Sequence, residues 1–432
     1  MTTENTNKLI RTVGFAGLVA MCINAVVGSG VFLLPHESFI RLGPFSLWAP
    51  LLFAIPVFIL VLNFAEAASH FDQPGGAYLY ARTAFGDFIG FETGWMNWLA
   101  RTTSLASLSN GMVLALALLQ PSLGQGWMRH AIIIAIVGIL GAIHFVGVRY
   151  GAASIYVFTL GKLVPLVGFI IVALLAWKSN PIPGSFTLPA GPIAWSEVAL
   201  FMLFAYAGFE NLGVPAGEFK NPRRDLPFAL LVGILAIAAI YALAQLGAMS
   251  ALPDLSHTKT PIASAAAELV GPIGMLIVTV GSLLSMAGTN SGTMLEGSRM
   301  LYALSLDRRM GPVSYVHPKF RTPTVAIVIH ASVALAMALA GSFAQLALLS
   351  AVARLATYLA TCCAVPWLRK LNEGFRAPGG YTVPILGVLV SLAFVWNLDA
   401  QKLLVAAIAI AVGAVIYFAT RESAPAPRTP SS

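Results

Sequence analysis

The stretch that decides the fold is NAVVGSGVFLLP, residues 24–35, where Gly28, Ser29 and Gly30 interrupt an apolar run. Glycine costs about 1 kcal/mol relative to alanine in the interior of a helix. Inside a bilayer, unwound backbone is tolerated only where it is buried in protein or lines a cavity. If the surrounding chain crosses a membrane, this stretch therefore predicts a helix that is broken beside a binding cavity.

The composition of the chain is that of a membrane protein. Of its 432 residues, 58% are hydrophobic and 10% are charged, against about 25% charged in a typical soluble domain. Apolar runs of roughly 20 residues, long enough to cross a bilayer, recur along the whole chain. We count twelve, at approximately 13–36, 44–70, 88–119, 130–148, 153–177, 196–217, 228–250, 266–303, 323–341, 344–368, 381–399 and 402–419. We therefore expect an all-α membrane protein with twelve transmembrane helices.

The basic residues indicate the orientation in the membrane. With the N-terminus inside, only Arg41, Arg129, Lys178, Lys259 and Lys402 fall in outer loops, and Arg101, Lys162 and Arg354 fall within spans. All other lysines and arginines then lie on the inner side, as is usual for cytoplasmic loops. We expect both termini in the cytoplasm, a cell (plasma or inner) membrane location, and no nucleic acid partner despite the net charge of +8.

Other local signals are weak. The polar N-terminus lacks the apolar core and cleavage site of a signal peptide. The three cysteines have no spacing typical of a metal site or a disulfide framework. We expect no metal, no cofactor and no required protein partner.

A second interruption lies in FAYAGFENLGVPAGEFKNPRRDLP, residues 204–227, which contains Gly208, Gly213, Pro215 and Gly217. Small residues in membrane helices often serve only close packing. Breaks at corresponding places in two halves, however, are typical of transporters built from inverted repeats. We therefore expect a five-plus-five inverted repeat with broken helices 1 and 6. Its parts are a cytoplasmic tail at 1–12, a first repeat at 13–177, a second at 196–368, two added helices within 381–419 and a disordered cytoplasmic tail at 420–432.

The two breaks offer opposite partial charges. The amides of Gly28, Ser29 and Gly30 open the second half of the first span, and a helix N-terminus favours a carboxylate. The carbonyl groups of Phe204, Ala205 and Ala207 close the first half of the sixth span and suit an ammonium group. Together they match the two charged groups of an α-amino acid.

Four motifs resemble the amino acid–polyamine–organocation (APC) transporter family. They are GSGVFLLP, PGGAYLYARTAFG (74–86), FAYAGFE followed by KNPRRDLP, and SRMLYALSLDRRMGPVSYVHPKFRTP (298–323). The resemblance implies the leucine-transporter-type fold, with the substrate carboxylate on the amides of 28–30 and its amino group on the carbonyls named above. It also implies that Phe204 is an aromatic lid over the substrate, where a lone phenylalanine would otherwise be read as packing. Arginine–agmatine exchangers of this family carry a tryptophan near Met294, and span 8 has none.

Lys162 lies about nine residues into its span, roughly 14 Å from the inner face at 1.5 Å per residue. That depth exceeds the reach of a lysine side chain, which argues against a snorkelling residue. The position resembles the fifth-helix lysine of sodium-independent family members. We consider two roles, a fixed cation that bridges to the first break and a group that gains and loses the coupling proton.

Other ionisable residues also fall at membrane depth, where charges are expensive and mark function by default. Arg101 could pair with Glu210 or contact an anionic substrate group. Glu210 could accept hydrogen bonds from the amides that the second break frees. Arg354 could likewise form an ion pair or contact the substrate, and the sequence indicates no partner for it. Glu66 and Glu296 could form inner-gate ion pairs with Arg82 or Arg299, or be interfacial charges. We expect His144 and His330 to be packing residues, and Ser282, Ser285, Thr289, Ser291 and Thr293 to give span 8 a polar face.

The leading interpretation is a secondary transporter for small neutral α-amino acids, independent of sodium and working by proton symport or exchange. Its partners would be the amino acid, protons and membrane lipids, and Ala207, Gly208 and Met294 would form an apolar pocket wall. An amine, polyamine or acidic amino acid exchanger is the alternative, and a basic interior disfavours polycations. A membrane enzyme lacks a clustered catalytic set in this sequence, and a channel would not need paired broken helices.

Overall fold

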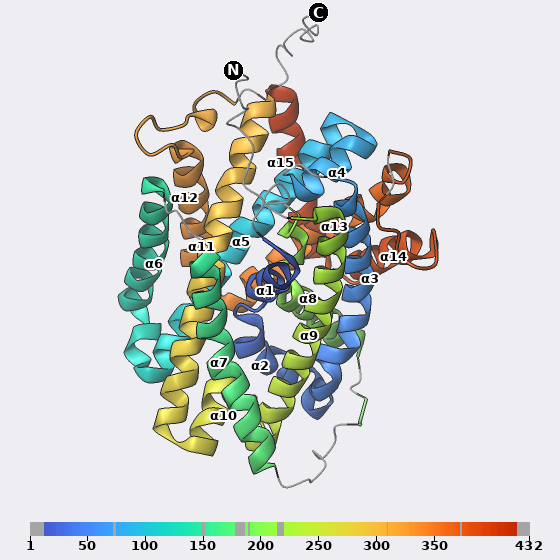
Figure 1. Ribbon diagram of the computed structural model, residues 1–432. Coiled ribbons are helices and arrows are strands. Elements are labelled where there is room, and N and C mark those ends of the chain that lie inside the picture. Colours follow the sequence, from blue (N-terminus) through green and yellow to red (C-terminus); the bar gives the residue numbers. More distant parts are fainter. Residues whose placement is uncertain are drawn as a thin grey trace, which may run out of the picture.

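The computed structural model describes residues 13–71, 75–147, 152–177, 186–188, 191–213, 220–308, 310–371 and 374–420, with the side chains of 152–158, 192–193 and 222 left aside. The tail at 1–12 and all but the first residue of the tail at 420–432 lie outside these ranges. The described residues form a bundle of helices (Figure 1).

Eight stretches of helix within the described ranges are long and apolar enough to cross a membrane. One stretch, Gly30–Ser69, includes α3 (Ala49–Ser69). The other seven lie within α5 (Asp87–Leu119), α6 (Gly126–Val146), α7 (Ala152–Ala176), α9 (Pro222–Ala251), α11 (Pro272–Arg308), α13 (Phe343–Leu368) and α15 (Ala400–Ala419). Shorter helices are α1 (Phe15–Val26), α2 (Gly30–Leu42), α4 (Gly76–Phe85), α8 (Pro192–Tyr206), α10 (Pro261–Val270), α12 (Thr324–Ala340) and α14 (Thr382–Trp396). The protein is thus a multi-pass membrane protein, as the composition predicts. The count of twelve spans and the inverted repeat stay predictions.

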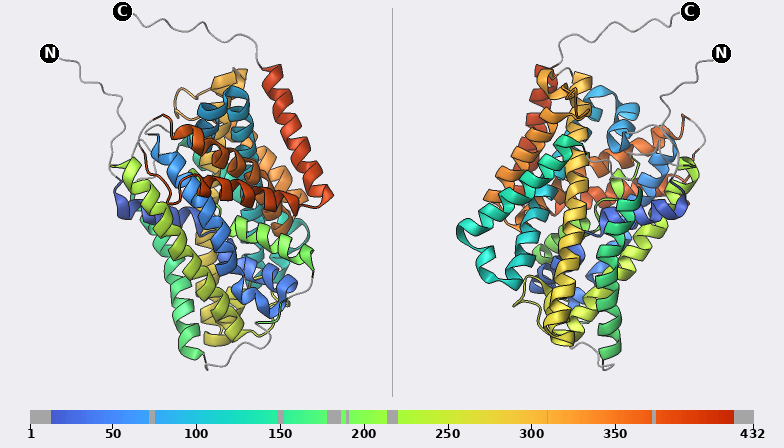
Figure 2. Two further views of the ribbon diagram at one scale, coloured as in Figure 1. Left: turned by 90° about the vertical axis from the view of Figure 1, so that its right-hand side faces the viewer. Right: turned by 60° about the vertical axis from the view of Figure 1, so that its left-hand side comes forward.

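The broken elements lie inside the bundle. In Figure 1, α1 and α8 are near its middle, whereas Figure 2 shows α15 along one edge. Exposed apolar side chains on the outer helices, such as Leu175 and Val415, suit contact with lipid tails. Polar and charged side chains gather instead around the centre, where they can find partners.

The first break is where the sequence predicts it. Helix α1 ends at Val26, the next residue Val27 is extended with φ −72° and ψ 92°, and α2 begins at Gly30. The second break follows α8, which ends at Tyr206. Ala207 is extended, Gly208 has φ +129°, and the short 3-10 helix η3 follows at Phe209–Asn211. Residues 214–219 of this segment lie outside the described ranges.

One predicted span is wrong in its extent. The apolar run at 266–303 joins parts of two helices, α10 and α11, which meet at Gly271 with φ +78°. Glycine adopts this left-handed conformation at little cost, and Pro272 starts a helix without needing a backbone donor. Hydropathy alone does not reveal the turn because both helices are apolar.

Candidate functional site

The glycines at the two breaks allow the backbones of the two broken segments to lie in direct contact. A Cβ atom on Gly30 would lie 2.8 Å from Ala205 Cα, and one on Gly208 would lie 2.5 Å from the carbonyl oxygen of Ala25. A Cβ on Gly28 would lie 3.3 Å from Thr289 Cγ2 on α11. Real Cβ atoms do not approach backbone this closely, so only glycine fits at positions 30 and 208.

Side chains from other helices hold the carbonyl end of α1. Lys162 on α7 is fully buried, and its Nζ donates to the carbonyl oxygens of Val27 at 2.8 Å and Asn24 at 2.9 Å. From α11, the Ser285 hydroxyl donates to Val27 at 3.1 Å and to Gly28 at 3.2 Å. These contacts satisfy backbone acceptors that would otherwise be costly to bury. They also place the ammonium of Lys162 directly against the first break.

Tyr241 on α9 connects both breaks. Its hydroxyl lies 3.2 Å from the carbonyl oxygen of Val26 and 2.9 Å from that of Ala205. A phenol has one proton to donate, so the two carbonyls share it. The sequence does not predict this contact, because a tyrosine in an apolar helix carries no local signal of such a role.

The amide end of α2 differs from the carbonyl end of α1. The backbone bonds that close the first turn of α2 are donated by Phe32 and Leu33 to the carbonyl oxygen of Ser29. The N–H groups before them are those that a helix start leaves without a partner in its own helix. The Ser29 hydroxyl is buried and has no hydrogen-bond partner among the described residues. Donors are thus available at this end.

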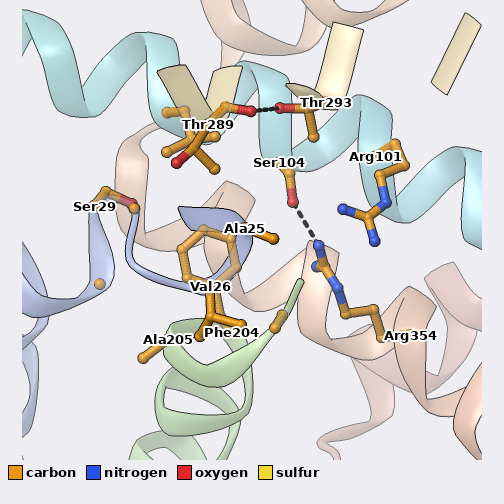
Figure 3. A pocket seen from close by; sticks show the side chains of 14 residues that line it. Ala25, Val26, Ser29, Arg101, Ser104, Phe204, Ala205, Thr289, Thr293 and Arg354 are labelled. Atoms are coloured by element: carbon orange, nitrogen blue, oxygen red, sulfur yellow. Dashed lines mark hydrogen bonds between the residues drawn. The ribbon is translucent and has the colours of Figure 1, made fainter. Parts of the chain in front are cut away.

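A cavity of about 30 Å³ lies between the breaks, which is room for a few water molecules. Its lining combines residues from six helices and the two breaks: Ala25, Val26, Gly28, Ser29, Gly30, Arg101, Ser104, Leu108, Phe204, Ala205, Ala207, Thr289, Thr293 and Arg354. In Figure 3, Ser29 lies to the left of the Phe204 ring, Thr289 lies above it, and Arg101 and Arg354 lie to the right. Six of the seven residues predicted to bind substrate line this cavity.

Met294 is the exception, because it does not lie at the cavity where the sequence predicts it. Its side chain is fully buried in an apolar cluster with Leu105, Ile133 and Leu346, and it is absent from the cavity lining. Successive residues of a helix point about 100° apart. Thr289 and Thr293, four residues apart, therefore share the face that lines the cavity, while Met294 points elsewhere.

Glu210 is the centre of a buried ion cluster next to the cavity. Its Oε1 accepts from Arg101 Nη2 at 2.7 Å and from Arg354 Nε at 2.8 Å. Its Oε2 accepts from the backbone N–H of Gly208 at 2.8 Å, as the sequence predicts for an amide freed by the break. Of the two arrangements considered for Arg101, the structure has the pair with Glu210, and the same carboxylate supplies the partner of Arg354.

The ion pairs considered for an inner gate are not those in the structure. Glu296 pairs with Arg101 at 3.1 Å, and Glu66 pairs with Arg369 at 2.5 Å. Arg82 pairs instead with carboxylates near the start of α5 and the end of α11, Asp87 at 2.8 Å and Asp307 at 3.1 Å. Sequence position gave the depth of each charge but not the direction in which its helix face points.

His144 and His330 are both buried, and each contacts a hydroxyl group. His144 Nε2 lies 2.9 Å from Ser291 Oγ, and His330 Nδ1 lies 3.1 Å from Thr102 Oγ1. Neither lines the cavity, which agrees with the packing role expected for them.

The chemical groups around the cavity match those of a small zwitterion. The start of α2 with the Ser29 hydroxyl and the carbonyl end of α8 both line the cavity. The carbonyl oxygens of Phe204 and Ala205 already accept from Ala207 N–H and Tyr241. Each carbonyl oxygen has a second lone pair, so both can accept a further hydrogen bond from an ammonium group.

Comparison with known proteins gives a consistent result. A family model described as amino acid permease matches residues 13–420. The chain is 30% identical over 410 residues to the serine/threonine exchanger SteT of Bacillus subtilis, covering 91% of this chain and 90% of that protein. It is 25% identical over 451 residues to the branched-chain amino acid permease BcaP of Bacillus subtilis, covering 96% and 94%. The region that the family model matches includes both breaks.

Proposed function

The chain belongs to the amino acid permease family of APC transporters, and on that premise we propose that it carries small neutral α-amino acids by alternating access. The family and the relatives consist of transporters, so the protein is a transporter of amino acids and not an enzyme. The substrate, the coupling and the orientation in the membrane belong to the proposal.

The observation that carries the proposal is the cavity between two broken helices that touch at Gly30 and Ala205. The substrate carboxylate would bind the N–H groups at the start of α2 and the Ser29 hydroxyl. The substrate ammonium would bind the carbonyl end of α8, with Phe204 covering it as a lid. Such a site recognises the groups that every α-amino acid shares.

The rest of the lining supports a small neutral side chain. Ser104, Thr289 and Thr293 supply hydroxyl groups, and the described lining includes no carboxylate that would attract a polyamine. Arg101 and Arg354 face the cavity, but Glu210 holds both, which disfavours an acidic substrate. The similarity to a serine/threonine exchanger favours hydroxyl amino acids as the first compounds to test.

Lys162 supports independence from sodium. Its ammonium contacts the carbonyl oxygens of Asn24 and Val27 and, at 3.4 Å, the hydroxyl of Thr289. Carbonyl and hydroxyl oxygens are also the ligands that an alkali cation would require. We propose that Lys162 takes the place of a coupling metal ion and that it gains and loses the coupling proton during transport. We also propose that residues 13–177 and 196–368 form two inverted repeats. The protein would lie in the cell membrane with both termini in the cytoplasm.

The test uses purified protein in liposomes loaded with unlabelled serine. We expect saturable counterflow of labelled serine, no acceleration by a sodium gradient, and acceleration by an inward proton gradient if transport is symport. A thermal-shift screen against the standard amino acids and common amines should rank small neutral compounds first. Stabilisation by polyamines or by glutamate alone, or uptake that requires sodium, would contradict the proposal.

A further inference from the structure

An apolar groove runs between α6 and α12 on the outside of the bundle, far from the cavity. Figure 1 shows these two helices side by side along one edge. We propose that the groove binds one acyl chain of an anionic phospholipid, whose phosphate group contacts Lys319 and Arg321 at the end of the groove.

Small residues form the groove, and larger apolar residues surround it. Gly138 and Gly141 of α6 both line the groove, and a Cβ on Gly141 would lie 3.7 Å from the Cβ of Ala331 on α12. Val137 and Ile327 are buried beneath, and Ile134 and Val328 are about half exposed on the walls. The volume is about 430 Å³, and the lining is almost entirely apolar. In a membrane such a hollow must be filled by hydrocarbon.

The depth of the groove matches one leaflet. Its lining on α6 extends from Ile134 to Val146, which is about 18 Å along the axis at 1.5 Å per residue. Half of a hydrocarbon core is roughly 15 Å thick. One chain that enters at the interface would therefore fill the groove along its length.

Basic side chains stand at one end of the groove. Phe145 of the lining contacts the rings of His317 and Phe320, and Thr322 donates to the Phe145 carbonyl oxygen at 2.7 Å. The turn held in this way presents Lys319 and Arg321, both exposed. No carboxylate among the described residues forms an ion pair with either cation, and the segment 310–323 contains no acidic residue.

The positive charge of Lys319 and Arg321 distinguishes between two possible occupants of the groove, a helix of a second copy and a phospholipid. A helix of a second copy would fill the groove but would leave both cations without a counter-charge. A phospholipid phosphate supplies the charge, and cationic side chains near a membrane surface are worth about five-fold in binding each. Clustered basic residues at the ends of membrane helices are a known setting for anionic headgroups. The lipid is the better match.

The experiment counts phospholipids that stay bound during native mass spectrometry of the full chain. The probes are palmitoyl-oleoyl phosphatidylglycerol and phosphatidylcholine, which share acyl chains and differ in charge. We expect preferential retention of phosphatidylglycerol, reduced about five-fold in Lys319→Gln and again in the double variant with Arg321→Gln. Glycerol phosphate without acyl chains should not compete.

Matched variants separate the groove from general effects. Gly138→Leu should abolish retention, because its Cβ enters open space and the side chain then fills the groove. Gly168→Leu makes the same change on α7, also in open space on an exposed surface, and should retain lipid. Lys370→Gln removes an exposed cation elsewhere and should also have no effect.

Three results would overturn the assignment: equal retention of both lipids, parental retention by Gly138→Leu, or conversion of a dimer to a monomer by Gly138→Leu. A phosphatidylglycerol with a photoreactive acyl chain tests the unmodified protein as well. Adducts should map to 134–146 and 327–335, and adducts spread evenly over the outer helices would contradict the proposal.

Discussion

The ammonium nitrogen of Lys162 lies 2.8 Å from the carbonyl oxygen of Val27, where α1 ends. The same oxygen accepts from Ser285 at 3.1 Å. Helices α7 and α11 therefore both hold the end of α1, and a change of charge on Lys162 would act directly on the first break.

Replacing Lys162 by alanine should abolish the response of transport to an inward proton gradient in liposomes. The reason is that the variant retains the substrate groups but loses the ammonium group that donates to the carbonyl oxygens of the first break. Ser285→Ala is the matched control, because it removes a neutral donor to the same carbonyl and should keep the response. Unchanged acceleration by the gradient in Lys162→Ala would exclude Lys162 from coupling.

Glu210→Gln should lower the free energy of unfolding by about 3–5 kcal/mol, because it removes the counter-charge of two buried arginines. It should also weaken substrate binding, since Glu210 orders Gly208 at the break. Denaturant unfolding and binding titration measure the two effects. Glu66→Gln, at an equally buried pair with Arg369, should lower stability and leave binding unchanged. Parental binding by Glu210→Gln would show that the ion cluster is only structural.

Gly30→Ala should cost about 1–3 kcal/mol of stability through overpacking and should stop transport, because the new Cβ would meet Ala205. Gly168→Ala, in open space on α7, provides the control and should be nearly neutral. Active Gly30→Ala protein would mean that the two breaks can separate without loss of the site. Labelled-serine counterflow measures the outcome.

Tyr241→Phe should slow transport, because it removes the hydroxyl that joins Val26 to Ala205. The loss of stability should be about 0.5–1.5 kcal/mol, the usual contribution of one hydrogen bond. Tyr206→Phe removes a bond of the same kind to the Pro50 carbonyl oxygen at 2.7 Å. It should cost similar stability with little effect on rate, and equal rates in the two variants would refute the bridging role.

Ser29→Ala should leave stability unchanged or slightly higher, because the hydroxyl is buried without a partner and its removal relieves an unpaired polar group. Affinity for the amino acid should fall about ten-fold, the value of a hydrogen bond to a charged group. The control is Ser38→Ala on the same helix, where the hydroxyl donates to Leu34. Equal affinity in the parent and Ser29→Ala would remove this hydroxyl from the site.

The sequence was sufficient to predict features that depend on local backbone chemistry. Both breaks follow from glycine density, and the bond from Gly208 to Glu210 follows from their spacing of two residues. The depth of Lys162 also follows from residue counting along one helix. In each case the relevant atoms lie within one segment of the chain.

Features that depend on how helices rotate against one another could not be predicted. The pair of Arg354 with Glu210 joins residues 144 apart in the chain, and Tyr241 meets a break on a different helix. Met294 was misplaced by the same limitation, since one step along α11 separates the cavity face from an apolar cluster. The position of a residue along its helix can be predicted from the sequence. The neighbour toward which its side chain points becomes known only from the packed structure.

The proposed recognition of the amino acid by main-chain groups has an evolutionary consequence. Peptide N–H and C=O groups survive almost any point mutation, whereas Ser104, Thr289 and Thr293 can be exchanged one at a time. Proteins that inherit such a site could change their substrate specificity through a few substitutions. They would still bind the α-carboxylate and α-ammonium groups that all the substrates share. Relatives named for hydroxyl and for branched-chain substrates are what this kind of divergence would produce.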